Sequence, residues 1–409
     1  MNIREKLVSP IAHTCDVLVC GGGFAGIAAA LSAARSGKRV ILLEKTYTLG
    51  GLGTAGLVTI YLPLCDGMGK QVSFGIAEEL FRLSISMGME PQLEMRYPDI
   101  WLDEDRASER NEKSMRFETQ YNPHLFAIMA EQLLRKEGVV ILYGASAVAV
   151  KMKKDKISSV LIEGKSGRQA IQAVSVVDAT GDCDIAKFAG ARTENFQQGN
   201  VLASWYYFMD EKGYHLNILG FADIPDDQKT DADREKDKGK KRYAGLGTEE
   251  LSRMMQDSHS STMQDVISRR GKGQDVWPVT IASIPQVRMT RKIVGEYTLD
   301  VAEEHTYMAD SIGMVSDWRK RGPVYEVPFG TLYSKNVKNL ITAGRCVSVT
   351  ESMWDIMRVI PCCAVTGEAA GLAAAMTDDF STLDVHALQN ELVRRGVVLH
   401  EQDNGRDLS

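Results

Sequence analysis

The sequence of 409 residues lacks the features that mark several classes of protein. No uninterrupted apolar run reaches the roughly 18 residues that a membrane helix needs, and residues 1–14 have no apolar core of a signal peptide. The net charge of -6 argues against binding of a nucleic acid, which would favour an excess of basic residues. The seven cysteines form no Cys-x-x-Cys pair, and their odd number is typical of reduced thiols. We expect a cytoplasmic protein without a membrane or nucleic-acid partner and without a metal site.

The most informative segment is the glycine-rich stretch CGGGFAGIAAA at residues 20–30. The apolar run at residues 16–20 is typical of a buried parallel strand, and residues 24–35 predict a helix that stops at Gly37. The pattern Gly21-x-Gly23-x-x-Gly26 permits a tight turn, close approach of backbone N–H groups to a pyrophosphate, and close packing of the helix on the strand. The N-terminus of the helix then faces the phosphates.

Glu44 completes a predicted dinucleotide-binding unit. It follows the second predicted strand, residues 40–43, and stands 18 residues after Gly26. A carboxylate at this point accepts hydrogen bonds from the ribose diol of an adenosine. A nicotinamide dinucleotide and a flavin dinucleotide both satisfy these motifs, so this unit alone leaves the cofactor open.

Three further motifs favour the flavin. Residues 50–56, GGLGTAG, directly follow Glu44 and are suited to run along a flavin and its pyrophosphate. Residues 178–182, DATGD, end a strand at a turn of small residues where the backbone lies beside the dinucleotide. Residues 339–375 contain a strand, a glycine turn and a helix opened by Pro361. A domain that binds only a nicotinamide dinucleotide does not need these motifs.

The remaining pattern indicates two domains, as the chain length allows. It predicts a helix opened by Asn122 and Pro123 that ends near Glu137, and strands at residues 139–143, 145–152 and 157–162. After about Gly190 come an aromatic cluster at residues 205–208 and a mixed-charge tract at residues 226–242, which we interpret as solvated. We predict a nucleotide-binding domain at residues 1–190 and 325–409 and an inserted substrate or cap domain at residues 191–324.

These motifs resemble the FAD-dependent oxidoreductase family of glutathione-reductase-type flavoproteins, with a distant similarity to fumarate reductase and succinate dehydrogenase flavoproteins. The matching segments are VLVCGGGFAGIAAALSAARSGKRVILLEK, GGLGTAG, VVDATGDCDIAKFAGA, VRMTRKIVGEY, YEVPFGTLYSKNVKNLITAGR and RVIPCCAVTGEAAGLAAA. The resemblance implies an α/β fold in which a Rossmann-like FAD-binding domain with a parallel sheet is interrupted by an inserted α+β substrate domain. The FAD contacts that it implies are Gly21, Gly23, Phe24, Ala25, Gly26, Glu44, Lys45, Gly50, Gly51, Thr54, Ala55, Val148, Ala179, Thr180, Gly181, Gly344, Arg345, Arg358, Pro361 and Cys362.

Two departures from relatives bear on the chemistry. Covalent flavoproteins of the succinate dehydrogenase type carry a histidine soon after the ribose carboxylate, whereas this chain has none between His13 and His124. We therefore expect FAD to be bound without a covalent bond. The disulfide reductases carry a redox Cys-x-x-Cys and a second GxGxxG domain, and this chain has neither. Cys362 and Cys363 adjoin the predicted flavin edge, but we favour two small buried residues over a redox pair.

Three arginines are the candidates for contact with the substrate. Arg288 and Arg291 lie in the segment VRMTRK, and Arg358 lies just before the Pro361 helix. Each presents a planar fork suited to a carboxylate or phosphate. Tyr61 and His305 are weaker candidates for a proton donor, because lone residues of these types are more often structural.

The sequence therefore predicts an FAD-dependent oxidoreductase that moves a hydride between flavin N5 and a small organic substrate, for which the arginines suggest an anion. The alternatives are a flavoenzyme without net redox chemistry, such as an isomerase or a thiazole-synthase-like biosynthetic enzyme, and a non-catalytic flavin-binding protein. The electron partner is not identified, and a homo-oligomer is left open.

Overall fold

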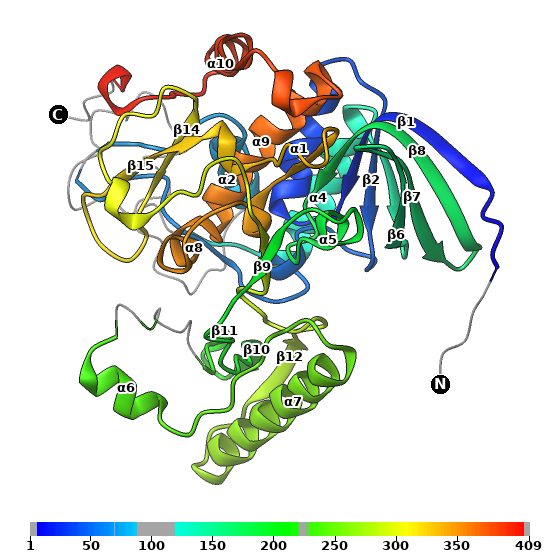
Figure 1. Cartoon of the computed structure of the whole chain (residues 1–409). Helices are drawn as coiled ribbons and strands as arrows, with labels where there is room; N and C mark the ends of the chain where they lie inside the picture. Colours follow the sequence, from blue (N-terminus) through cyan, green and yellow to red (C-terminus); the bar gives the residue numbers. More distant parts are fainter. Residues whose placement is uncertain (1–5, 69, 88–118, 221–225, 227–228, 405–409) are drawn as a thin grey trace.

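A seven-stranded sheet forms the centre of the larger part of the molecule (Figure 1). The computed structural model describes residues 6–68, 70–87, 119–220, 226 and 229–404. The strands lie in the order β5-β2-β1-β8-β7-β6, with β16 also paired to β8. Their bounds are β1 Ile11–Cys20, β2 Val40–Glu44, β5 Val140–Tyr143, β6 Ser146–Lys153, β7 Lys156–Gly164, β8 Gly167–Asp178 and β16 Leu340–Thr342.

The sheet combines a parallel half with an antiparallel meander. Strands β5, β2, β1, β8 and β16 run parallel, while β6, β7 and β8 pair antiparallel in sequence order. Side chains of the parallel strands alternate between two cores: Val17 and Val19 pack on one face, and Leu18 and Cys20 on the other. The predicted Rossmann-like parallel sheet is thus confirmed.

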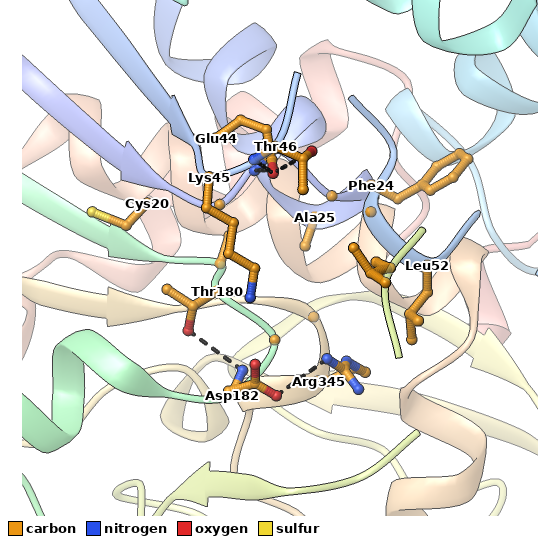
Figure 2. A pocket seen from close by; sticks show the side chains of 18 of the residues that line it. Cys20, Phe24, Ala25, Glu44, Lys45, Thr46, Leu52, Thr180, Asp182 and Arg345 are labelled. Atoms are coloured by element: carbon orange, nitrogen blue, oxygen red, sulfur yellow. Dashed lines mark hydrogen bonds and ion pairs between the residues drawn. The ribbon is translucent and has the colours of Figure 1, made fainter. Parts of the chain in front are cut away.

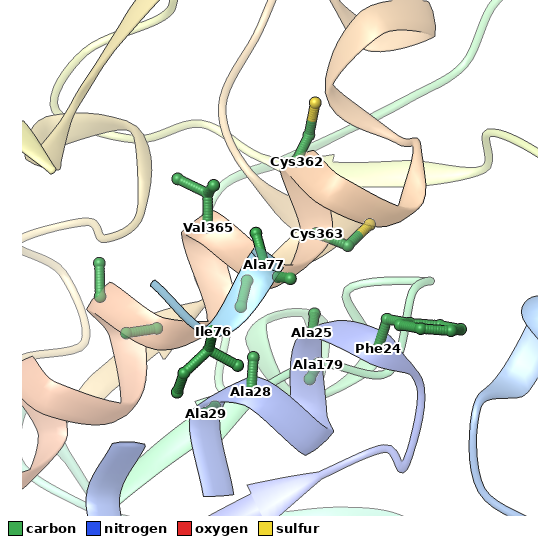
Figure 3. Packing of buried hydrophobic residues seen from close by; sticks show 14 of the residues in the cluster. Phe24, Ala25, Ala28, Ala29, Ile76, Ala77, Ala179, Cys362, Cys363 and Val365 are labelled. Atoms are coloured by element: carbon green, nitrogen blue, oxygen red, sulfur yellow. The ribbon is translucent and has the colours of Figure 1, made fainter. Parts of the chain in front are cut away.

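Two small-residue helices cover one face of the sheet, α1 (Phe24–Arg35) and α9 (Ile360–Met376). Figure 3 shows these helices side by side, with Ala25, Ala28 and Ala29 of α1 at their contact. A Cβ atom added to Gly367 would lie 2.3 Å from the Ala25 carbonyl oxygen, and one added to Gly371 would lie 2.1 Å from that of Ala29. The two backbones therefore approach more closely than any side chain larger than hydrogen allows.

Further helices and short strand pairs extend both cores. The α-helices are α2 Ile76–Ile85, α4 Pro123–Lys136, α5 Asp184–Phe188, α8 Glu351–Met357 and α10 Val385–Arg394. The strand pairs are β3 Ile60–Tyr61 with β4 Thr119–Gln120, β9 Thr193–Asn195 with β13 Arg291–Ile293, and β14 Ser311–Ser316 with β15 Val324–Pro328. The Asn122 side chain caps α4, as the sequence predicts.

A smaller sheet lies below the first in Figure 1. It has the order β11-β10-β12 and packs on α7 (Thr248–Gly271); its strands are β10 Tyr206–Asp210, β11 Gly213–Asn217 and β12 Trp277–Ile281. Tyr206 and Phe208 share a core with Val266 of α7, so this part of the predicted aromatic cluster is packing. Helix α6 (Asp231–Asp237) buries none of its residues, which confirms solvent exposure for this part of the charged tract, whereas Lys229 just before it is buried and pairs with Asp226 and Asp237.

The predicted cap segment, residues 191–324, also contributes to the larger core. Leu299, Ile312 and Val315 pack in the same hydrophobic cluster as α1 and α9. Among the described residues, no single helix is long and apolar enough to cross a membrane; α8 and α9 meet that test only together, and a bend of 89° separates them. Most of α9 is buried in the protein core.

We predict that Gly371→Ala destabilises the fold, because its Cβ would overlap the backbone of α1. The free energy of unfolding should fall by about 1–3 kcal/mol, as is common for overpacked cores. Gly271→Ala at the end of α7 is the matched control, since nothing lies within 4 Å of an added Cβ there. That variant should be neutral or stabilised by up to about 1 kcal/mol. Equal effects of the two changes in chemical denaturation would contradict the tight contact.

Glu368, on α9, provides a pH-dependent test of the same core. Its side chain is buried and accepts a hydrogen bond of 2.7 Å from the Ile76 N–H, yet burial raises its pKa from its ordinary value of 4.5 to about 7. The folded protein thus holds the proton more tightly than the unfolded chain. This contribution to stability is complete below about pH 4.5 and is lost as the pH rises through about 7.

We therefore predict that the stability of the parent protein, measured relative to Glu368→Gln, falls by about 3 kcal/mol between about pH 4 and about pH 8. In the difference between the two free energies of unfolding, the contributions of all other titrating groups cancel, because both proteins share those groups. The measurement is urea denaturation of both proteins across the pH range. A constant difference in the free energy of unfolding would show that Glu368 does not titrate in this interval.

Candidate FAD site

A cavity lies at the carboxyl ends of the central parallel strands (Figure 2). Its wall includes Cys20 at the end of β1, Glu44 at the end of β2, Ala179 directly after β8 and Ala343 directly after β16. In open α/β sheets this edge is where dinucleotides bind. The fold thus brings together four strand ends that the sequence places far apart.

The glycines of the first motif are needed at their positions for different physical reasons. Gly21 has a φ of +108°, and an added Cβ would lie 2.3 Å from the Ala179 carbonyl oxygen. An added Cβ at Gly26 would lie 1.8 Å from the Gly21 carbonyl oxygen, so this glycine lets α1 begin against the strand. A Cβ at Gly23 would meet nothing within 4 Å. Gly23 therefore leaves open space in the cavity wall, which fits a ligand that approaches the backbone.

The N-terminus of α1 opens into this space. Gly23 is its N-cap and supplies no side-chain hydrogen bond, and Phe24 and Ala25 line the cavity. The first N–H groups of a helix have no partner within the helix, and the helix dipole favours negative charge there. Together with the open space at Gly23, this arrangement fits the pyrophosphate of a dinucleotide.

Glu44 is held in a fixed orientation by the loops around it. Its Oε2 accepts a hydrogen bond of 2.9 Å from the Gly22 N–H, and its Oε1 accepts bonds of 2.7 and 2.8 Å from the N–H and hydroxyl of Thr46. A carboxylate offers about four acceptor positions. Acceptor capacity therefore remains for the ribose diol, and the carboxylate is already oriented before the ligand arrives.

The opposite wall carries mixed charges. Figure 2 shows Lys45 extending from the end of β2 toward the turn at Thr180 and Asp182. Asp184 lines the same wall; burial, with Asp182 and Asp178 nearby, raises its pKa to about 6. Arg345 donates hydrogen bonds of 2.6 and 2.8 Å to the carbonyl oxygens of Val287 and Arg288. It therefore fixes the segment around Val287 against the wall.

The N-terminus of α9 forms the other end of the cavity. Its N-cap Val359 has no capping side chain, and Ile360 and Cys363 line the wall. Burial raises the pKa of Cys363 to about 12 and that of Cys362 well above its usual range, so both stay protonated. Figure 3 shows the two sulfur atoms pointing in different directions. Two buried thiols with structural roles fit these observations better than a redox pair.

Most of the residues predicted to contact FAD lie together around this cavity. Those in its wall are Gly21, Gly23, Phe24, Ala25, Glu44, Lys45, Gly50, Gly51, Ala179, Thr180, Gly181, Gly344, Arg345 and Arg358. Those outside the wall are Gly26, Thr54, Ala55, Val148, Pro361 and Cys362. The hydroxyl of Thr54 donates to the Leu49 carbonyl oxygen, and β6 reaches the wall through Ser146 and Ala147 instead of Val148.

The three candidate arginines have different surroundings. Arg358 lines the cavity, but its Nε and Nη2 both donate to the Asp355 carboxylate, the former at 2.9 Å. Arg291 lies outside the wall and forms an ion pair of 2.6 Å with Asp184. Arg288 is buried behind the wall, and its Nη1 has no hydrogen-bond partner among the described residues.

The weaker candidates for a proton donor have structural roles. The Tyr61 hydroxyl donates to the Ala77 carbonyl oxygen, and burial raises its pKa well above the usual range. His305 lies 2.9 Å from Glu401 and is exposed. Neither residue lines the cavity.

The sequence analysis missed the residues by which the predicted cap completes the wall: Gly245, Leu251, Ile284, Pro285 and Val287. Gly245, Leu251, Ile284 and Pro285 lie in no motif, because tertiary packing alone brings them to the cavity. Val287 is the first residue of the segment VRMTRKIVGEY, and residues 284–287 directly precede the candidate Arg288.

Comparison with known proteins identifies the family. The profile described as FAD dependent oxidoreductase matches residues 16–204 and 206–392, which is nearly the whole chain. The chain belongs to the FAD-dependent oxidoreductase family. The resemblance inferred from the sequence motifs is confirmed, and FAD is the cofactor of this enzyme.

Other similarities are partial or distant. A thioredoxin reductase from Ureaplasma parvum serovar 3 is 33% identical over 72 residues, which span 18% of this chain and 23% of that relative. A geranylgeranyl bacteriochlorophyll reductase-like protein from Thermoplasma acidophilum matches with a TM-score of 0.42 and 12% identity, over 94% of this chain and 82% of that one. A flavocytochrome c3 fumarate reductase matches with a TM-score of 0.41 and 14% identity, over 90% and 79%.

We predict that Glu44→Gln lowers the affinity for FAD by about tenfold or more, or about 1.5–3 kcal/mol. The variant loses charge-assisted hydrogen bonds to the ribose, and its amide N–H₂ must face donor groups of Gly22 or Thr46. FAD released by acid, then titrated back while flavin fluorescence is followed, measures the affinity and tests the expected noncovalent binding. Glu163→Gln, on the surface beside Arg168, is the control. Equal affinity in all three proteins would place the ribose elsewhere.

Proposed function

We propose that this enzyme transfers a hydride between flavin N5 and a small organic substrate at the α9 end of the cavity. The observation that carries the proposal is the composition of this wall. Ile360 and Cys363 come from the start of α9, whereas Ile284, Pro285 and Val287 come from the predicted cap. A cavity shared between the cofactor domain and an inserted segment offers a place for a second molecule beside the flavin.

The residues at this end have three tasks during such a reaction. The uncapped N-terminus of α9 stabilises negative charge on a group that lies against it. The apolar side chains of Ile284, Pro285 and Val287 limit the access of water. Arg345 holds the Val287 carbonyl oxygen at 2.6 Å and so keeps this wall in place. FAD, when bound, supplies the redox chemistry itself.

A flavoenzyme without net redox chemistry is the second candidate, because the same cavity suits an isomerase or a biosynthetic enzyme. The two candidates differ in one measurable property. An oxidoreductase changes the redox state of its flavin with substrate alone in the absence of oxygen, whereas the alternative enzyme returns its flavin unchanged in every turnover.

We further propose a cytosolic enzyme with a small-molecule substrate, a separate electron donor or acceptor and no nucleic-acid partner. The seven cysteines all lie in the described part of the chain, and each is free and buried, which suits a reducing compartment. A homo-oligomer is compatible with the proposal, and the molar mass in solution decides it.

The test is an anaerobic screen of small organic metabolites in which the oxidised enzyme is followed for bleaching of the visible absorbance band of the flavin and the photoreduced enzyme for return of that band. We expect at least one compound to change the redox state of the wild-type flavin, and Ile284→Trp to slow that change on the order of tenfold or more while FAD content is unchanged, because the larger ring occupies substrate space. Ile281→Trp, three residues earlier and 44% exposed, is the matched control. Turnover to an isomeric product without bleaching would favour the second candidate.

A further inference from the structure

Arg288 is a buried cation whose Nη1 group has no hydrogen-bonded anion among the described residues. Only 7% of the residue is exposed, and its Nη1 has no hydrogen-bond partner among the described residues. The guanidinium carbon lies 5.2 Å from the centre of the Trp205 ring, which supplies a weak cation–π contact. A buried charge without a hydrogen-bonded partner is costly, so this arrangement is incomplete in the protein alone.

Neighbouring arginines make the position more positive. Burial, and then the charges of Arg358 and Arg345, lower the pKa of Arg288 well below its usual range. Both neighbours line the cavity, whereas Arg288 is buried and is not part of the wall, so the guanidinium lies near a wall that carries two positive charges. Val287, the residue directly before it, is part of that wall.

The carboxylates of this region are bonded to other arginines. Asp355 accepts hydrogen bonds from Arg358, Asp182 forms an ion pair of 3.4 Å with Arg345, and Asp317 forms one of 2.9 Å with Arg319. Among the described contacts, Arg288 is left without such an ion pair. One positive charge is therefore available to an anion that enters the cavity.

The geometry distinguishes two arginines that the sequence presents as similar candidates. Arg358 lies at the cavity surface, but Asp355 already occupies two nitrogen atoms of its fork. Arg288 lies deeper and retains an unused donor. Ser204, adjacent in sequence to Trp205, also has a buried hydroxyl without a partner among the described residues, so two polar groups of this region lack a hydrogen bond.

We propose that Arg288 anchors a carboxylate of the substrate, with Arg345 and Arg358 providing the surrounding positive field. The inference rests on the proposed function, since it concerns the substrate of the same cavity. Two groups could supply the oxyanion that Arg288 binds: a carboxylate of the substrate or a phosphate of FAD. The carboxylate is favoured because Val287 and Trp205 belong to the predicted cap, while the open space at Gly23 and the α1 N-terminus already suit the pyrophosphate.

The test uses the FAD-loaded enzyme and three probes: benzoate, its neutral analogue benzamide, and inorganic phosphate. Binding is followed by the change in flavin absorbance and by the rise in thermal unfolding temperature, neither of which needs turnover. We expect benzoate to bind the wild-type enzyme at least about tenfold more tightly than benzamide or phosphate. Arg288→Met should weaken benzoate binding by about tenfold or more, leave FAD content unchanged, and leave the weaker binding of benzamide unaffected.

Arg269→Met is the matched control. Arg269 also lies over an aromatic ring, that of Phe208 at 4.9 Å, but it is paired with Asp265 at 2.7 Å and is not in the cavity wall. Arg288→Lys should recover part of the benzoate affinity, because it restores charge without the planar fork. Because Arg288→Met removes an unpaired buried charge, its unfolding temperature without ligand should equal or exceed that of the wild type.

Three results would overturn the inference. The first is no saturable response of the wild type to benzoate, and the second is equal benzoate affinity in the wild type and Arg288→Met. The third is a loss of FAD affinity in Arg288→Met with benzoate binding intact, which would assign Arg288 to the cofactor phosphates. These binding results are independent of the anaerobic screen, so hydride transfer can fail there while the carboxylate site stands, and the reverse.

Discussion

The close contact between α1 and α9 is the constraint on which the rest of the site depends. Gly367 and Gly371 let the two helix backbones meet without intervening side chains. As a result, the N-terminus of each helix reaches the same cavity, one at the glycine loop and the other at Ile360. A dinucleotide with charge at its pyrophosphate and at its reacting ring needs two such positive ends at fixed separation.

Around this pair of helices, the predicted cap closes the cavity, and Arg345 holds it there. The guanidinium of Arg345 bonds the carbonyl oxygens of residues 287 and 288 and pairs with Asp182 after β8. One side chain therefore connects the cofactor domain to the segment that faces the substrate. The same region holds Arg288 and Arg358, and the charges of Arg358 and Arg345 both lower the pKa of Arg288.

The arginines illustrate the limit of reasoning from residue type. From the sequence, Arg288, Arg291 and Arg358 are similar candidates in neighbouring motifs. The structure separates them by their partners: Asp184 binds Arg291, Asp355 binds Arg358, and Nη1 of Arg288 is unused. Asp184 lies more than a hundred residues from its partner Arg291, whereas Asp355 lies 3 residues from its partner Arg358. Spacing in the chain therefore does not reveal which arginine charges are neutralised.

By itself, the sequence determined the strand, glycine loop and helix at residues 16–35, the carboxylate at Glu44 and the helix opened by Pro361, because each depends on local backbone geometry and on periodic burial; the observed strand begins earlier, at Ile11. It also determined the family, since these local motifs follow one another along the chain and the family profile matches nearly all of it. Only the tertiary structure decided that Ile284, Pro285 and Val287 close the cavity and that Nη1 of Arg288 lacks a hydrogen-bond partner among the residues that the structure describes. The cavity wall and the burial of Arg288 arise from contacts between distant segments, and no local pattern encodes them.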